Sequence, residues 1–227
     1  MDEAWFEIRW RLLFSLALVL SPLAGFYLKG VPSPEAAAKV LAVVALLWVF
    51  TAVPLAGAGI RTQSPLQGTK GLHGSTQFTL SLPVSRFRLL SVRAGMGLVA
   101  MFALILFSAA AAWLCFPILR ANSTLSGFAA WILTVACCAA AFHAISILAS
   151  TVLDEYWHVW ASMLSIGLLK WLTVRFPPPP SLDVFRVMAE ASPLRTHSLP
   201  WPAILVSLSF AALVFAMAAK LVETREY

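Results

Sequence analysis

The chain has 227 residues, of which 60% are hydrophobic and only 11% are charged, and its mean hydropathy is +0.85. Soluble globular domains carry roughly 25% charged residues, so this composition excludes an ordinary soluble domain and is typical of a membrane protein. A net charge of +6 would also suit a nucleic-acid-binding protein. In so apolar a chain, however, we expect the basic residues to lie at lipid headgroups and no nucleic acid to be bound.

Residues 1–11, MDEAWFEIRWR, have the composition of an amphipathic helix that lies in a membrane interface. Trp5 and Ile8 fall on one helical stripe with Leu12, while most charged residues lie elsewhere around the helix. A polar beginning of the first membrane span would fit the same residues. The sequence therefore predicts a helix here and leaves both positions open.

Long apolar segments, separated by shorter polar ones, predict an all-α polytopic membrane protein that forms one domain over residues 1–227. A helix needs about 20 residues to cross a hydrocarbon core of about 30 Å, and the first segment is close to the lower limit. The six predicted spans are residues 12–28, 40–60, 94–119, 125–153, 157–176 and 200–222.

Several residues within the spans carry expectations of their own. Trp48 and Pro54 in the second span are compatible with a lipid-facing, slightly kinked helix. Gly95 and Gly97 in the third span indicate close helix packing. Lys170, near the end of the fifth span, can extend its charged end toward the nearer membrane interface. The cysteines show no metal-ligand spacing and are interpreted as small buried hydrophobic residues: Cys115, Cys137 and Cys138.

The fourth span is rich in alanine and serine, which suits burial among other helices, and His143 is its one ionisable residue. An ionisable residue inside a membrane is by default a candidate functional site. A neutral imidazole that is hydrogen-bonded to a neighbouring helix needs no such role, and we favour this structural interpretation. His143 is kept as a possible intramembrane polar site.

Residues 78–93, FTLSLPVSRFRLLSVR, combine clustered arginines with apolar residues between the second and third spans. Each arginine would cost roughly 2.5–3.5 kcal/mol at the centre of a membrane, so this segment must lie at a membrane face. Pro83 interrupts it, and Ser85 is placed to cap a helix that runs from Arg86 to Arg93 and into the third span. Such a segment could transmit force to that span.

The remaining loops decide the orientation. An even number of spans puts both termini on one side, and the lysines and arginines of the loops are more numerous on that side, which predicts cytoplasmic termini and a cytoplasmic loop at 61–93.

Between the fifth and sixth spans, Pro177–Pro180 is a stiff polyproline segment, and residues 181–189 can form a short amphipathic helix with Val184, Val187 and Met188 on one side.

The sequence contains no recognisable catalytic constellation. It has no G-x-x-x-x-G-K-[ST] phosphate loop, no H-E-x-x-H motif and no paired carboxylates within a span. We therefore assign no catalytic residue, no metal ligand and no cofactor to this chain. A transporter built on it would need an energy source outside it.

The order of an amphipathic N-terminal segment, six spans and the motif F-T-L-S-L-P-V-S-R-x-R-L-L-x-x-R between spans two and three resembles the permease subunits of bacterial ABC transporters of the type-2 exporter class. In that family the region that matches Leu80–Arg86 forms or adjoins the coupling helix, which sits in a groove of the ATPase subunit. The resemblance implies that the residues coupled to the ATPase are Phe78, Leu80, Leu82, Pro83, Ser85, Arg86 and Arg88.

The resemblance also implies partners and a mechanism. The chain would be a transport subunit of the bacterial inner membrane and not itself an enzyme, paired with a second permease copy as a homodimer or heterodimer and surrounded by membrane lipid. A separate ATP-binding cassette ATPase would bind ATP and Mg²⁺ and drive alternating access for an unidentified substrate. The short first span and Pro177–Pro180 depart from the family pattern. The alternatives are a non-catalytic polytopic assembly or scaffold protein and, third, a membrane enzyme that acts on lipid.

Overall fold

The computed structural model describes residues 2–30, 33–56, 85–153, 155–189 and 198–224. Within these ranges the regular elements are all helices, so the predicted all-α class is confirmed. Four helical segments are long and apolar enough to cross a membrane, which is compatible with the predicted membrane protein: Arg11–Leu28, Phe87–Cys115, Leu125–Val152 and Trp201–Thr224. The predicted number of six spans is not confirmed.

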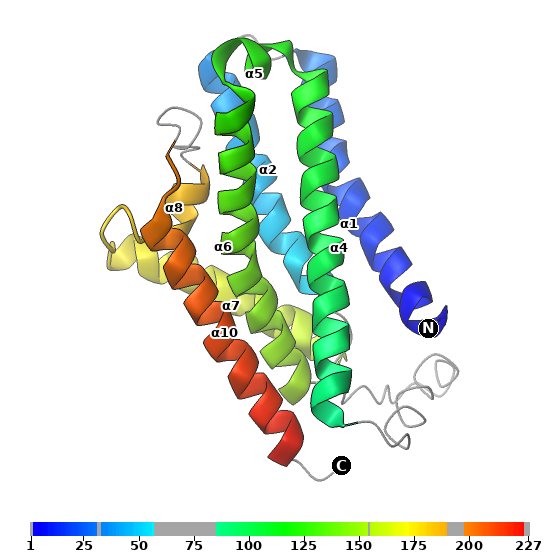
Figure 1. Cartoon of the computed structure of the whole chain (residues 1–227). Coiled ribbons are helices and arrows are strands. Elements are labelled where there is room, and N and C mark those ends of the chain that lie inside the picture. Colours follow the sequence, from blue (N-terminus) through cyan, green and yellow to red (C-terminus); the bar gives the residue numbers. More distant parts are fainter. Residues whose placement is uncertain (1, 31–32, 57–84, 154, 190–197, 225–227) are drawn as a thin grey trace.

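Helices α1 (Asp2–Lys29) and α2 (Pro34–Leu55) form an antiparallel pair at the N-terminal end of the chain (Figure 1). Gly30, at φ +73°, ends α1, and this left-handed backbone conformation favours glycine. The Ser33 side chain then caps α2 by accepting a hydrogen bond from the Ala36 N–H at 3.2 Å. The backbone of residues 2–11 continues directly into the first span, so it forms the first turns of α1 and not a separate helix.

Helix α4 (Arg86–Cys115) is joined to α6 (Leu125–Val152) through the short helix α5 (Pro117–Asn122). The third span was predicted to reach residue 119, but α4 ends at Cys115 because Phe116 is extended (φ −110°, ψ 94°) and Pro117 begins a new helix. Thr124 then caps α6 by accepting from the Gly127 N–H at 3.2 Å. The two long helices therefore lie side by side and antiparallel.

Helix α6 is the central element of the fold. It packs most extensively against α10 (Trp201–Thr224) and also contacts α2, α4, α7 (Glu155–Arg175) and α8 (Val184–Ala189). Small side chains let these neighbours approach closely and are buried in the second half of α6: Ala139, Ala140, Ala141, Ala144, Ser146 and Ser150. The predicted burial of the fourth span is thus confirmed.

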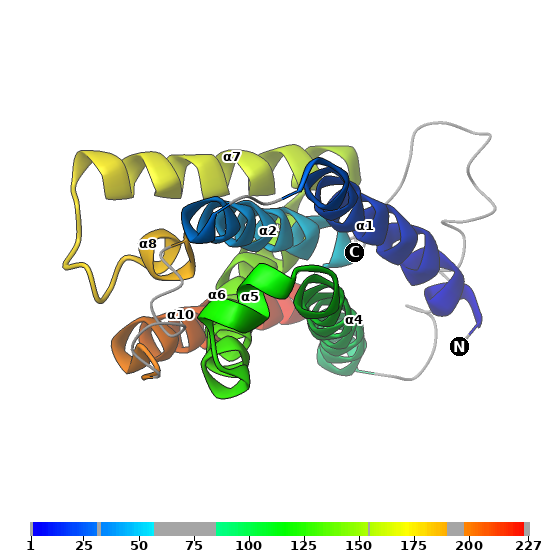
Figure 2. The same cartoon turned by 90° about the horizontal axis from the view of Figure 1, so that it is seen from above.

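Helix α7 was predicted to be the fifth span, but it runs across the other helices instead of along them (Figures 1 and 2). Its inner face buries His158, Ser162 and Ile166. Its outer face is an apolar stripe at helical spacing that is more than half exposed: Trp157, Trp160, Leu164, Leu168 and Trp171. The predicted amphipathic helix that follows is α8, which buries Val187 and Met188.

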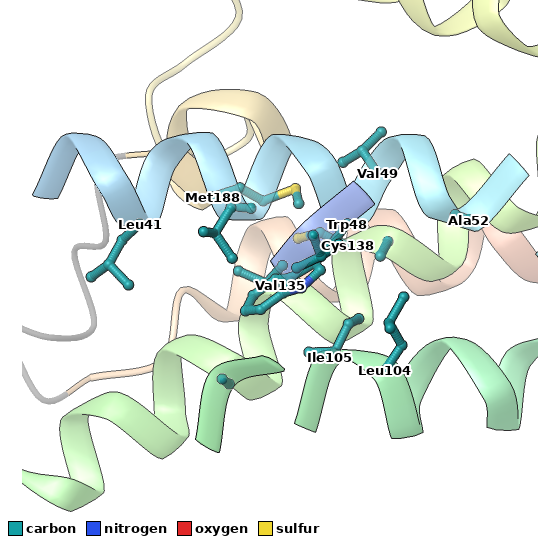
Figure 3. Packing of buried hydrophobic residues seen from close by; sticks show 14 of the residues in the cluster. Leu41, Trp48, Val49, Ala52, Leu104, Ile105, Val135, Cys138 and Met188 are labelled. Atoms are coloured by element: carbon teal, nitrogen blue, oxygen red, sulfur yellow. The ribbon is translucent and has the colours of Figure 1, made fainter. Parts of the chain in front are cut away.

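Buried residues of α2, α4, α6 and α8 meet in the core shown in Figure 3. Trp48 of α2 lies with its ring centroid 5.3 Å from that of Trp131 on α6 and donates its indole N–H to Ser108 Oγ of α4 at 2.8 Å. Trp48 is completely buried, so the prediction that it faces lipid is wrong. Cys138 lies in the same core as predicted, whereas Cys115 is exposed.

The helix ends are arranged so that the beginnings of α1 and α4 and the ends of α6 and α10 lie toward the same end of the molecule (Figure 1). Helix α2 ends at Leu55, and α4 begins at Arg86. The segment 57–84, which contains most of the residues predicted to couple to an ATPase, therefore connects these two helix ends.

Candidate functional site

The last carbonyl groups of α2 are the centre of the candidate site. The end of a helix leaves its final carbonyl oxygens without partners inside the helix, and Pro54 supplies no N–H of its own. Three side chains from two other helices contact this end: His143 Nδ1 lies 3.2 Å from the Ala52 oxygen, Ser146 Oγ donates to the Val53 oxygen at 3.2 Å, and Arg11 Nη1 donates to the Pro54 oxygen at 3.2 Å. Helix α2 is thus fixed by polar contacts inside the bundle.

A positive charge at this place is favoured by the helix dipole. The C-terminal end of a helix carries a partial negative charge, which a nearby cation stabilises by about 0.3–1 kcal/mol, and by more where the site is partly buried. Arg11 lies in the third turn of α1 and is half-buried against the end of α2. This contact ties the beginning of the first span to the end of the second.

His143 connects the end of α2 to α4. Its side chain is 2% exposed, its Nδ1 lies 3.2 Å from the Ala52 oxygen of α2, and its Nε2 lies 3.2 Å from the Ala94 oxygen of α4. A neutral imidazole has one N–H and can donate to only one of these oxygens at a time, whereas an imidazolium donates to both. The geometry agrees with the structural interpretation of this residue, a ring bonded to neighbouring helices, and shows that two helices share it.

Gly97 of α4 makes this arrangement sterically possible. A Cβ atom at this position would clash with the Leu55 carbonyl oxygen of α2 and would lie 2.9 Å from His143 Cε1. The predicted close packing is therefore confirmed at Gly97. At Gly95 it is not, because an added Cβ there meets nothing within 4 Å.

A chain of hydroxyl groups extends the site from α6 to α7. Ser162 of α7 donates to the His158 carbonyl oxygen at 2.7 Å, and its Oγ lies 3.2 Å from Ser146 Oγ on α6. All three residues are buried, with exposed fractions of at most 1%. We call the contacts of Arg11, Ser146, His143, Gly97 and Ser162 around the end of α2 the α2-end junction; it joins α1, α2, α4, α6 and α7.

The residues predicted to couple to an ATPase are described only in part. Phe78, Leu80, Leu82 and Pro83 lie outside the described residues. Ser85 caps α4 as predicted, since its Oγ accepts from the Arg88 N–H at 3.3 Å, and Arg86 begins the helix.

Arg88 is exposed and lies six residues before Ala94, about 9 Å along the helix axis at about 1.5 Å per residue. Helix α4 is continuous from this cap through the whole predicted span. The predicted helix from Ser85 into the third span is therefore confirmed, and it brings the capped end within three turns of the α2-end junction.

Sequence reasoning missed Arg11 and Ser146 as members of the junction. Arg11 was counted only among the charged residues of the N-terminal segment, and Ser146 only among the small residues of the fourth span. The missing N–H of Pro54 frees only the carbonyl of Phe50, four residues earlier, so it was no signal for the junction. The carbonyls of Ala52, Val53 and Pro54 are available because α2 ends at Leu55. Which side chains would satisfy them depends on the packing of helices that are far apart in the sequence.

Comparisons with family models, with curated proteins and with solved structures find no match to this chain. Within the described ranges, no group of three or more His, Cys, Asp or Glu residues is placed to hold a metal ion. What the α2-end junction offers chemically is a set of hydrogen bonds between helices. Its members are suited to holding helices in a fixed relation.

Proposed function

We propose that this chain is the membrane subunit of an ATP-binding cassette exporter that works with a separate ATPase. The observation that carries the proposal is the course of α4. One uninterrupted helix begins at the Ser85 cap, directly after the segment that resembles a coupling helix, and continues through Cys115. A displacement of the segment 57–84 would therefore move the whole of α4.

The α2-end junction supports the same mechanism. The segment 57–84 is attached to α2 at one end and to α4 at the other, and His143 together with Gly97 holds the end of α2 against α4 within about three turns of the beginning of α4. Force that reached the segment would act on both helices as a unit and on α6 through His143. Binding of ATP and Mg²⁺ by the partner ATPase would supply that force.

In this proposal the chain crosses the bacterial inner membrane six times, with cytoplasmic termini. The apolar part of α2, Lys39–Leu55, would be a short crossing of about 26 Å at about 1.5 Å per residue. Helix α7, with 21 residues and a length of about 32 Å, would be the fifth crossing only by turning from its course across the bundle toward the membrane normal. A second permease copy would complete the transport pathway. The substrate is left open, because apolar side chains that line a pathway and those that face lipid are alike.

The test is co-purification from the native source. The full-length chain, carrying an affinity tag and solubilised in a mild detergent, is isolated and its partners are identified by mass spectrometry. We expect an ATP-binding cassette ATPase to be recovered in a fixed ratio to the chain. Recovery of the intact chain with no nucleotide-binding subunit under several detergent conditions would contradict the proposal and would favour the scaffold alternative.

A further inference from the structure

A hollow between α2 and α8, with a volume of about 260 Å³, lies away from the α2-end junction. Side chains of α2 from Ala42 to Val49 form one wall, and Phe185 and Met188 of α8 form the other. Val43 and Leu46 are 40% and 46% exposed, so the α2 wall opens to the surroundings of the protein. Its volume is close to the lower end of the range for ligand-binding sites.

Lys170 of α7 is the charged residue in the lining of this hollow. Its ammonium lies 5.1 Å from the ring centroid of Phe185, within the range of about 6 Å for a cation–π contact. In the part of the chain that the structure describes, no carboxylate forms an ion pair with it. The prediction that this lysine extends to the interface misses this contact, which holds the ammonium at the hollow.

A second lysine lies beside the lining of the hollow. Lys39 is exposed and precedes Ala42 and Val43 by one helical turn, but it is not itself a lining residue. It adds positive charge next to the apolar α2 wall.

The apolar walls alone do not select an occupant, because lipid tails are as apolar as the side chains of the lining. The positive charge of Lys170 does select a class of occupant. A lysine ammonium has three donors and no acceptor, so it binds the oxygens of an anionic group. Each lysine near a membrane surface strengthens the binding of an anionic lipid by about fivefold.

We propose that the hollow binds an anionic phospholipid of the surrounding bilayer, with its phosphate at Lys170 and one acyl chain along the α2–α8 wall. This site is independent of the proposed transport function. The lipid would link α8 to α2 and so would stabilise the position of Phe185, whose ring packs 5.3 Å from that of Phe142 on α6.

The experiment compares two lipids that differ only in the headgroup. The full-length chain, purified in a zwitterionic detergent, is titrated with phosphatidylglycerol or with phosphatidylcholine of the same acyl chains, and bound lipid is counted by native mass spectrometry. We expect phosphatidylglycerol to bind more tightly by at least about fivefold. Lys170→Gln should reduce that preference by about fivefold.

Matched controls separate the site from general surface charge. Lys220→Gln changes an exposed lysine of α10 that does not line the hollow, and it should leave the preference unchanged. Ala42→Phe should fill the hollow and abolish the preference while Lys170 remains, with helical circular dichroism as the check that the variant is folded.

Equal binding of the two lipids by the wild type, or equal effects of Lys170→Gln and Lys220→Gln, would overturn the proposal. So would displacement of phosphatidylglycerol by inorganic phosphate alone at millimolar concentration, because the site would then recognise a free anion and not a lipid.

Discussion

A Cβ atom at Gly97 would clash with the carbonyl oxygen of Leu55, because α4 and α2 approach each other backbone to backbone at this point. Two residues earlier, Gly95 faces open space. The two glycines lie in the same turn of the same helix and differ only in what surrounds them. They therefore form a matched pair for testing the contact between α2 and α4.

Gly97→Ala should destabilise the protein, whereas Gly95→Ala should not. Crowding a packed interior typically costs about 1–3 kcal/mol, and the clash here is with backbone, which cannot rotate away. Replacing a helical glycine with alanine otherwise gains about 0.5–1 kcal/mol, so Gly95→Ala should be neutral or stabilising. The measurement is the free energy of unfolding in mixed micelles. Equal stability of the two variants would contradict the close approach.

His143→Phe should weaken the α2-end junction and so lower the free energy of unfolding. The phenyl ring retains the aromatic volume but cannot donate to Ala52 or Ala94. Hydrogen bonds between membrane helices contribute about 0.6 kcal/mol on average and about 1.7 kcal/mol at most, so a loss of about 0.6–2 kcal/mol in unfolding free energy is expected. Ser146→Ala removes one donor to Val53, which also accepts from Ala56 N–H at 3.2 Å, and should cost less.

The same His143→Phe variant tests the proposed mechanism. His143 lies inside the bundle and is not part of the segment 57–84, so the variant should still bind the ATPase, while export should fall because α2 and α4 no longer move as a unit. Binding is measured by co-purification and export by uptake into inverted vesicles once a substrate is known. A variant that is destabilised as expected yet exports at the normal rate would show that the junction is structural only.

Trp48 and Ser108 should show a coupling energy in a double-mutant cycle. The variants Trp48→Phe and Ser108→Ala each remove the 2.8 Å bond between the indole N–H and Ser108 Oγ. Because Ser108 also donates to the Leu104 carbonyl oxygen at 2.7 Å, its hydroxyl stays bonded in Trp48→Phe. We expect a coupling of about 0.6 kcal/mol, the average for such bonds in membrane proteins. Strictly additive effects would show that the bond contributes nothing.

Local features of this fold could be predicted from the sequence. Ser85 followed by a helix-forming run predicts the cap of α4, and the small residues of α6 predict that it is buried among other helices. Both depend on neighbours within a few positions along the chain. The end of α4 at Cys115 could also have been predicted, because Pro117 disfavours a helical conformation at Phe116, although the predicted span continued to residue 119.

Features that depend on contacts between distant helices could not be predicted. Trp48 was interpreted as compatible with a lipid-facing helix because an apolar residue has the same hydropathy whether it faces lipid or protein. Its burial follows from contacts with other helices, among them Trp131 and Ser108. The direction of α7 was missed for a similar reason. Its length allows a span, while its course across the bundle follows from the buried contacts of His158, Ser162 and Ile166.

The segment 57–84 provides the last prediction. If Leu80 and Leu82 insert into a groove of the ATPase, the double variant Leu80→Asp/Leu82→Asp should insert into the membrane normally, because neither residue belongs to a predicted span. Loss of a buried interface anchor often costs more than about 2 kcal/mol, roughly thirtyfold in affinity, and a buried unpaired charge should cost at least as much. The variant should therefore fold but lose both ATPase association and export.

The control for this prediction is Leu182→Asp, which adds a carboxylate at an exposed leucine of the loop between α7 and α8. It should leave ATPase association unchanged, because it lies outside the segment that connects α2 to α4. Both variants are compared by co-purification with the ATPase and by thermal unfolding, so that a loss of binding can be distinguished from a loss of fold. If the Leu80/Leu82 variant is folded and retains the ATPase at wild-type affinity, the segment 57–84 does not couple the chain to an ATPase.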